Sequence, residues 1–193
     1  MIKATTYLLF SIFLYFTALS SALADDNVAL NKLYTHFNDA FDELDVSRLN
    51  SIYSVDACYI PESQELEIAL GRDKIVELYQ NFFGKVKSRN AKLEVDFRVI
   101  ERNIEGTSAT DIGYYLIRFH PSDDAGEPVS EFAGKFVTVA RKRGDGQWNL
   151  TVDTNNKAEA SFYFNASPSS NLYYGRQFSA LNSLQNNQDY DND

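Results

Sequence analysis

The chain has 193 residues, of which 44% are hydrophobic and 14% aromatic, a composition that indicates one globular domain with a core and excludes a disordered chain. Its formal net charge of −9 disfavours nucleic acid and anionic lipid as partners, because both would be repelled. A single cysteine, Cys58, excludes an intramolecular disulfide. Its place in the apolar run "DACYIP" predicts a buried, unreactive thiol, the alternative being a reactive thiol or one that pairs between chains.

The first 24 residues predict a secretory signal peptide. Lys3 precedes an apolar run over residues 7–19, and Ala22-Leu23-Ala24 has the small-residue pattern of a cleavage site. The alternative is a membrane anchor, which is disfavoured because the run is shorter than the roughly 20 residues of a spanning helix. We therefore expect a mature chain that begins near Asp25, is exported to a periplasm or the cell exterior, and does not contact the membrane after cleavage.

Apolar residues spaced three and four apart predict three helices in the N-terminal half. The first covers residues 26–44, the second is short and is capped by Asp45, and the third covers residues 72–86. Between the second and third helices, the run "ACYI" has strand propensity and is stopped by Pro61. A short strand pair is therefore expected before the third helix.

The period of the apolar residues changes to two after residue 87, which predicts strands. Four alternating runs follow, at about 91–103, 108–119, 129–142 and 147–155, and hairpin connections separate them. Asp145-Gly146 is the strongest turn signal in the chain. The order of elements predicts an α+β fold in which helices cover one face of an antiparallel meander.

The last segment, residues 157–193, is polar, rich in Ser and Asn, and acidic at its end. Two interpretations stay open for it. One is a mobile tail with a few docked aromatic residues, and the other is a tail with a short helix near Arg176 to Leu184.

Two segments resemble the nuclear transport factor 2-like superfamily, in particular its SnoaL-like and ketosteroid-isomerase-like branch. They are "LNSIYSVDACYIPESQELEIALGRDKIVELYQNFF" and "GKFVTVARKRGDGQWNLTVDTNN". The resemblance covers about residues 27–156, within an expected domain of residues 25–156. It implies a cone-shaped fold, with three N-terminal helices packed on a curved antiparallel sheet around a pocket. It does not imply one reaction, because the superfamily includes isomerases, cyclases, dehydratases, binding modules and oligomerisation domains.

The resemblance can be followed residue by residue for ketosteroid isomerases. These enzymes use a tyrosine on the first helix, an aspartate base, and a protonated aspartic acid on a strand. With Tyr53 and Asp56 aligned, these positions fall at Phe37, at Pro61 and on or near Lys135. Phe37 cannot donate a hydrogen bond and Pro61 has no basic group, so steroid isomerisation by this mechanism is not expected.

The alignment also assigns the faces of the last strand. It points alternate residues into the cavity, namely Asn149, Thr151, Asp153 and Asn155, and it places Trp148, Leu150 and Val152 on the outer face. Lys135 would then face Asp153 inside the cone, either as a structural pair on a polar floor or as the catalytic residues. The expected ligand-binding wall consists of Tyr59, Tyr115, Asn155, Phe37 and Phe83.

Three functions follow from this interpretation. The first is an exported domain that binds a small, partly apolar molecule. The second is a SnoaL-like, cyclase-like or isomerase-like enzyme, with Asp153 as acid or base and Lys135 or a tyrosine stabilising an oxyanion. The third is a structural or protein-interaction module; the apolar outer face predicts a homodimer in any case.

Metal and cofactor chemistry have no support in the motifs. His36 and His120 match no metal-ligand spacing, so no metal site is expected. The sequence has no phosphate-binding loop, dinucleotide-binding fingerprint, serine triad or CxxC pair, and no cofactor is expected.

Overall fold

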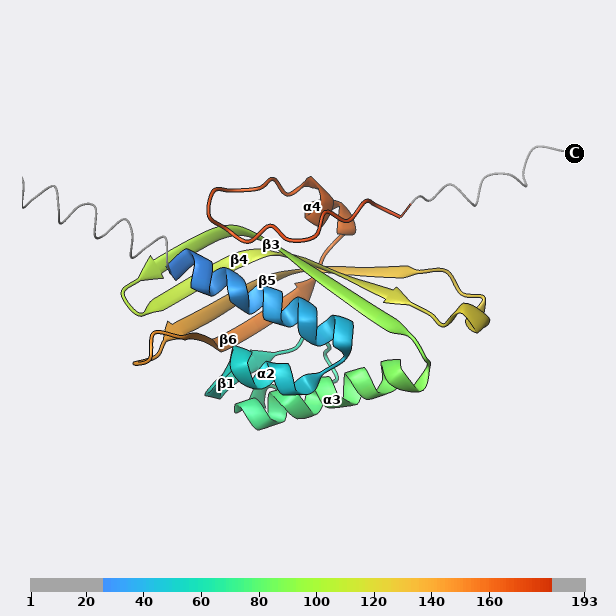
Figure 1. The fold of residues 1–193 in the computed structure, drawn as a ribbon, viewed down its shortest axis with the longest axis horizontal. Coiled ribbons are helices and arrows are strands. Elements are labelled where there is room, and N and C mark those ends of the chain that lie inside the picture. Colours follow the sequence, from blue (N-terminus) through green and yellow to red (C-terminus); the bar gives the residue numbers. More distant parts are fainter. Residues whose placement is uncertain (1–25, 182–193) are drawn as a thin grey trace, which may run out of the picture.

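The computed structural model describes residues 26–181 (Figure 1). A first helix covers residues 26–43. It is followed by the short helices η1 (Val46–Arg48) and α2 (Leu49–Ile52), strands β1 (Tyr53–Ile60) and β2 (Ala69–Leu70), and helix α3 (Arg72–Ser88). The second half contains β3 (Lys92–Glu105), β4 (Ser108–His120), η2 (Asp123–Ala125), β5 (Ser130–Lys142), β6 (Trp148–Lys157) and α4 (Ala160–Asn165). The expected signal peptide lies outside the described residues.

Local signals place the element boundaries. The Asp45 side chain accepts a hydrogen bond from the Ser47 amide at 2.9 Å and caps η1, as its position in the sequence predicts. Between β5 and β6, Asp145 accepts from the Gln147 amide and Gly146 has φ 84°, a left-handed conformation that favours glycine. No helix within residues 26–181 is long and apolar enough to cross a membrane.

The six strands form one open sheet with the order β2-β1-β6-β5-β4-β3. Strands β3 to β6 are the expected antiparallel meander, which confirms the α+β class. The sheet is mixed rather than wholly antiparallel, because β1 runs parallel to β6, with Tyr59 beside Asp153. No turn joins β1 to β6, so the sequence holds no local signal for the direction of this pair.

The first helix and α3 lie against one face of the sheet, which we call the inner face (Figure 1). Their apolar stripes pack against inward-facing strand residues to form the main core. This core includes Leu30, Leu33, Phe37, Phe41, Ile52, Ile75, Phe83, Leu93, Val95 and Leu150. The burial follows from the helical spacing of the apolar residues on each helix.

A β-bulge in β6 changes which residues face the core. Val139 pairs with Val152 but Ala140 pairs with Leu150, so Thr151 is an extra residue in the ladder. The alternation therefore reverses there, and Trp148 and Leu150 are both buried in the main core. The prediction that these two residues form an outer apolar patch is wrong for this reason.

Cys58 also differs from the prediction. It is partly exposed rather than buried, and its ladder neighbours are Val152 on β6 and Leu70 on β2. The strand predicted from "DACYIP" is present as part of β1. Cys58, however, lies on the opposite face from the buried Ala57.

The segment after β6, residues 158–176, packs back on the sheet. Helix α4 contacts β4 and β5 on the outer face, where the Phe162 ring stacks on Tyr114 with centroids 6.1 Å apart. Farther along, the Val99 amide donates to the Tyr173 carbonyl at 2.9 Å, so the segment pairs with the free edge of β3. The helix of the C-terminal segment is thus Ala160–Asn165; residues 176–181 contain no helix, and 182–184 lie outside the described residues.

Two charged residues of β3 explain how this segment is held. The Arg98 guanidinium carbon lies 4.0 Å from the Tyr163 ring centroid, and its Nη1 donates to the Tyr163 carbonyl at 2.5 Å. Asp96 accepts from the Tyr163 hydroxyl at 2.5 Å and from the Arg176 amide at 2.7 Å. Both charged side chains are buried because the C-terminal segment covers them.

Candidate ligand-binding cavity

A cavity of about 320 Å³ lies between the helices and the inner face of the sheet. The first helix, α3, the β1 strand with its following loop, and β3 to β6 all contribute to its wall. The lining residues are Tyr34, Phe37, Phe41, Tyr59, Pro61, Glu62, Ser63, Leu66, Leu78, Tyr79, Phe82, Val95, Phe97, Tyr115, Ile117, Phe136, Thr138, Asp153 and Asn155. Aromatic side chains dominate this wall, and no Lys, Arg or His belongs to it.

Asp153 is the buried acid of the cavity. It lies on β6 between Tyr59 of β1 and Thr138 of β5, and it is 6% exposed. The Tyr53 hydroxyl donates to Asp153 Oδ2 at 2.5 Å, and among residues 26–181 this is the one hydrogen bond to the carboxyl group. Burial raises the pKa of Asp153 to about 6, while the Tyr53 hydrogen bond acts in the opposite direction.

Three tyrosines surround this carboxyl group. Burial, followed by the nearby Asp153 charge, raises the pKa of Tyr53 well above its ordinary value and that of Tyr59 to about 12. Burial also raises the pKa of Tyr79. All three phenols therefore stay protonated at neutral pH and present hydroxyl groups around one acid.

Asn155 supplies another polar group of the cavity wall. Its Nδ2 donates to the Tyr59 hydroxyl at 3.1 Å. Its Oδ1 is buried and has no hydrogen-bond partner among the described residues. A buried carbonyl oxygen without a donor is unfavourable, so a donor from a bound molecule would stabilise it.

The mouth of the cavity contains a second acid. The Tyr115 hydroxyl donates to Glu62 Oε2 at 3.0 Å, and Glu62 lies in the exposed loop after β1. Gly134 permits this arrangement, because a Cβ atom at that position would lie 2.4 Å from the Tyr115 ring. Leu66 and Phe82 are exposed by 48% and 39%, so the rim is apolar.

A separate buried ion pair lies near the cavity. Arg102 donates to both oxygens of Asp111, at 2.7 and 2.6 Å, and the Tyr34 hydroxyl donates to the same carboxylate at 2.7 Å. The guanidinium group also donates to Asn27. Arg102 is therefore committed to this cluster.

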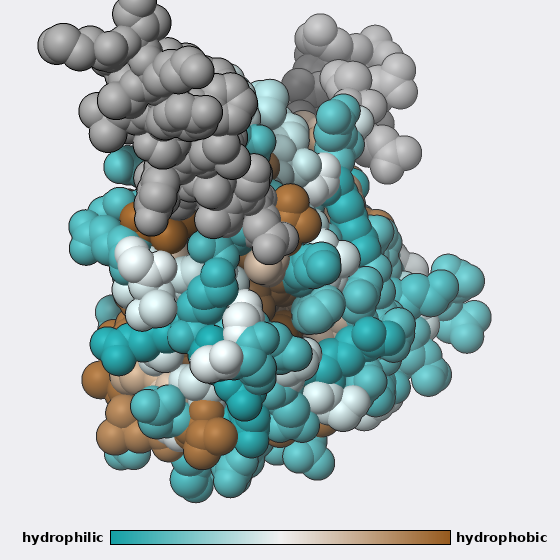
Figure 2. Space-filling model, turned by 60° about the vertical axis from the view of Figure 1, so that its left-hand side comes forward, coloured by the Kyte–Doolittle hydropathy of each residue, from teal (hydrophilic) through white to brown (hydrophobic). Residues whose placement is uncertain are grey.

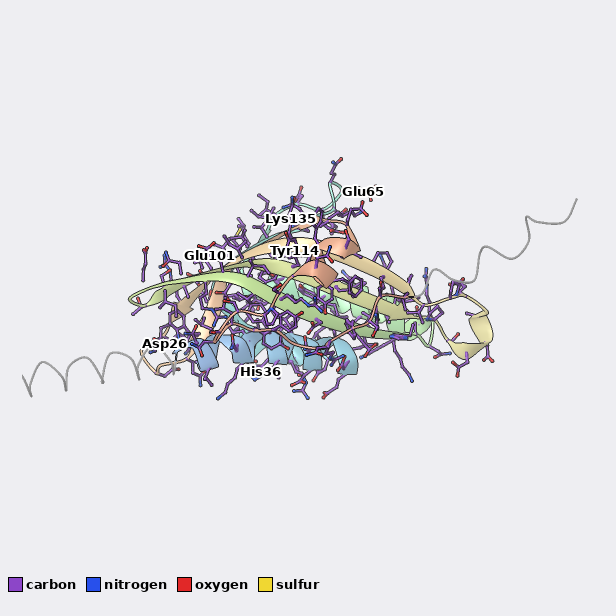
Figure 3. The ribbon with its side chains drawn as sticks, turned by 90° about the horizontal axis from the view of Figure 1, so that it is seen from above. Asp26, His36, Glu65, Glu101, Tyr114 and Lys135 are labelled. Carbon is purple, nitrogen blue, oxygen red and sulfur yellow. The ribbon has the colours of Figure 1, made fainter. Side chains whose placement is uncertain are left out.

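Lys135 does not belong to the cavity. It is exposed on the outer face, and the β5 residue opposite Asp153 is Thr138. Thr138 and Lys135 are an odd number of residues apart, so their side chains point to opposite faces of the sheet. Figure 3 shows Lys135 and Tyr114 on the side of the sheet away from the first helix, which carries His36. The predicted Lys135–Asp153 pair is not formed.

The remaining expected residues divide into two groups. Tyr59, Tyr115, Asn155 and Phe37 line the cavity together with Asp153. Phe83 does not line it, because it points into the core against Phe41, and its neighbour Phe82 lies at the cavity instead.

The bulge in β6 also changes the polar wall. Asn149 donates to the Ser51 carbonyl and Thr151 to the Val139 carbonyl, and neither lines the cavity. Tyr53, Tyr79 and Glu62 were not anticipated as polar groups of the site. The helical stripe identifies Tyr79 as buried, but no motif indicates that its hydroxyl group lies near Asp153.

Metal-binding geometry is not observed within residues 26–181, where no group of three or more His, Cys, Asp or Glu side chains could hold an ion. His120 lies 2.7 Å from Glu94, away from the cavity. His36 is half-buried on the first helix.

Solved structures resemble this chain in fold. No protein-family model and no curated protein matches it. An NTF2-like protein with a cystatin-like fold from Novosphingobium aromaticivorans is 16% identical, with a TM-score of 0.63 over 76% of this chain and 92% of that one. An NTF2-like superfamily protein from Salmonella enterica is 14% identical, with a TM-score of 0.56 over 72% and 94%. A ketosteroid isomerase-like protein from Erwinia carotovora is 16% identical, with a TM-score of 0.54 over 68% and 95%. The chain therefore has the nuclear transport factor 2-like fold.

Proposed function

We propose that the chain binds a small, partly apolar molecule in the cavity. The observation that carries this proposal is an aromatic wall with two polar groups, the buried Asp153 carboxyl group and the buried Asn155 Oδ1 atom, whose hydrogen-bonding capacity the protein does not use fully. The volume of about 320 Å³ lies at the lower end of the range of ligand pockets, about 300–1,000 Å³. Apolar walls with few convergent polar groups are typical of such sites.

The ligand-binding proposal can be tested with one variant inside the cavity and one control variant outside it. Gently purified protein would be analysed by native mass spectrometry for a bound small molecule. We expect a noncovalent adduct in the wild type and its loss in Asn155→Leu, which removes the amide of the cavity. Lys135→Gln on the outer face is the control and should keep the adduct. Absence of any adduct, with no saturable thermal shift from a library of small aromatic compounds, would contradict the proposal.

A second candidate function is proton transfer by Asp153. A buried carboxyl group with a pKa of about 6, placed in a cavity, can accept and release a proton near neutral pH. Lys135 has no part in this proposal, and an oxyanion would be stabilised by a tyrosine hydroxyl such as that of Tyr59. Compounds recovered from the cavity would be tested for turnover. Asp153→Asn should abolish turnover while binding persists, and unchanged turnover in this variant would exclude the role.

Export and self-association are further proposals for this chain. We propose that residues 1–24 are removed on export, and N-terminal sequencing of secreted protein should begin near Asp25.

A homodimer would use the part of the outer face that α4 leaves open, where Ile112 and Val137 are exposed by 45% and 38%. Figure 2 shows another side of the molecule, on which hydrophobic residues also gather in patches on a largely hydrophilic surface. Sedimentation should show a dimer that Val137→Glu dissociates, and a monomeric wild type would contradict this.

A further inference from the structure

The charges that line the cavity all have one sign. Asp153 is deep in the cavity, Glu62 is at its mouth, and no basic side chain belongs to the wall. The groups that face Asp153 from the neighbouring elements are the phenols of Tyr53, Tyr59 and Tyr79 and, farther off, that of Tyr115. None of these phenols carries a positive charge.

Two cations on other strands of the sheet do not balance the charge of Asp153. Arg102 holds both oxygens of Asp111. Lys135 projects from the opposite face of the sheet (Figure 3). Asp153 thus has one phenol hydrogen bond and no compensating positive charge within residues 26–181. An ionised carboxylate buried in this way is unfavourable, because proteins normally pair such a charge or protonate it.

The aromatic wall also favours a positively charged ligand. The rings of Phe37 and Phe97 have centroids 5.5 Å apart, and those of Phe97 and Phe136 are 5.8 Å apart, so several rings converge on one space. The faces of aromatic rings carry partial negative charge and attract cations. An organic anion would meet two carboxyl groups and no basic side chain in this wall, and it would be repelled.

We propose that the ligand of this cavity is a small protonated amine that carries an apolar group about the size of one aromatic ring. Its ammonium group lies beside Asp153, its N–H donates to the unpartnered Asn155 Oδ1, and its apolar body packs among the phenylalanines. A quaternary ammonium ion would satisfy the charge but not this oxygen, so an amine with N–H groups is preferred. The inference rests on the proposed ligand-binding function and specifies the chemical class of ligand.

The test uses three probes of similar size and different charge: phenethylamine as the cation, phenethyl alcohol as the neutral compound and hydrocinnamate as the anion. Binding to the full chain would be measured by isothermal titration calorimetry at about pH 7.5, where the amine is protonated. We expect phenethylamine to bind at least about tenfold more tightly than phenethyl alcohol, and hydrocinnamate to bind most weakly. Asp153→Asn should abolish the preference for the amine, and the exposed control Asp124→Asn should retain it.

The outcomes separate this inference from the function on which it rests. If phenethyl alcohol or hydrocinnamate binds as tightly as the amine, the cavity binds ligands but the inference on charge is wrong. If none of the three binds saturably, the inference fails, and the ligand-binding function is decided separately by native mass spectrometry and the thermal-shift library. The wild-type comparison decides between these results even if Asp153→Asn does not fold.

Discussion

Replacing Asp153 by asparagine removes a buried charge, and we expect the variant to be more stable than the wild type above about pH 7. Asparagine keeps a side-chain oxygen that can accept the hydrogen bond from the Tyr53 hydroxyl. The change therefore removes mainly the charge rather than the shape or the main contact of the side chain.

The size of the effect follows from the pKa of Asp153. Burial raises it to about 6, against an ordinary value of 3.8, a difference of about 2 pH units. Each unit corresponds to about 1.4 kcal/mol. Because the folded state binds this proton more tightly than the unfolded state, Asp153 favours folding most at low pH. This contribution is lost as pH rises from about 4 to about 7, and the loss amounts to about 3 kcal/mol.

Urea denaturation of both proteins between about pH 4 and pH 8 would measure this difference. We expect the free energies of unfolding to be similar near pH 4 and the variant to gain roughly 2–3 kcal/mol by pH 8. Subtracting the wild-type curve removes the contributions of other acids, and Asp124→Asn is the exposed control. Parallel curves would show that Asp153 titrates normally. A variant less stable than the wild type at pH 8 would show that the carboxylate has a favourable charged partner, and either result would refute the reasoning.

Four other substitutions test the structure. Asp111→Asn leaves the Arg102 guanidinium without its buried carboxylate and should lower the free energy of unfolding by about 3–5 kcal/mol in urea; a loss under about 1 kcal/mol would be inconsistent with a buried pair. Arg98→Met removes the donor to the α4 carbonyls, so limited proteolysis should cleave residues 158–176 faster than in the wild type, and equal rates would contradict the contact. Gly134→Ala forces the Tyr115 ring to move and should lower Tm by several degrees in a thermal scan. Lys135→Gln should change the free energy of unfolding by less than about 0.5 kcal/mol, whereas a larger loss would favour the Lys135–Asp153 pair.

Much of the fold could be predicted because its signals are local. The four expected strand runs correspond to β3 through β6, within a few residues at each end. The third predicted helix corresponds to α3, which ends at Ser88. Period-two and helical patterns depend on neighbouring residues, and turn signals such as Asp145-Gly146 act within the hairpin itself.

The candidate site was predicted only in part. The wrong predictions concern which face of a strand a residue occupies, and strand register decides that face. The bulge at Thr151 reverses the alternation of β6, and nothing in the residues around it indicates an extra residue. Lys135 was placed inside the cone by alignment. The observed register instead puts Thr138 opposite Asp153, and a shift by an odd number of residues exchanges the two faces of a strand.

The C-terminal segment shows the same division between local and long-range information. Its Ser- and Asn-rich composition gives little indication of packing, yet Tyr163 and Phe162 anchor α4 on the sheet. Asp96 and Arg98 alternate with apolar residues on β3 and therefore have the pattern of an exposed strand face. They are buried because a segment more than sixty residues later in the chain covers them.

The sequence by itself determined the α+β class, the order of the elements as far as β6, and the presence of an acid on the last strand, since periodicity, capping and turn chemistry act over a few residues. The tertiary structure alone decided that Asp153 meets Tyr53 rather than Lys135, that β1 pairs in parallel with β6, and that the C-terminal segment covers part of the outer face. The Tyr53–Asp153 contact joins residues 100 positions apart, and the C-terminal segment reaches Asp96 and Arg98 from more than sixty positions later in the chain. The free energies of these contacts arise from burial and pairing in the assembled fold, and local sequence patterns do not encode them.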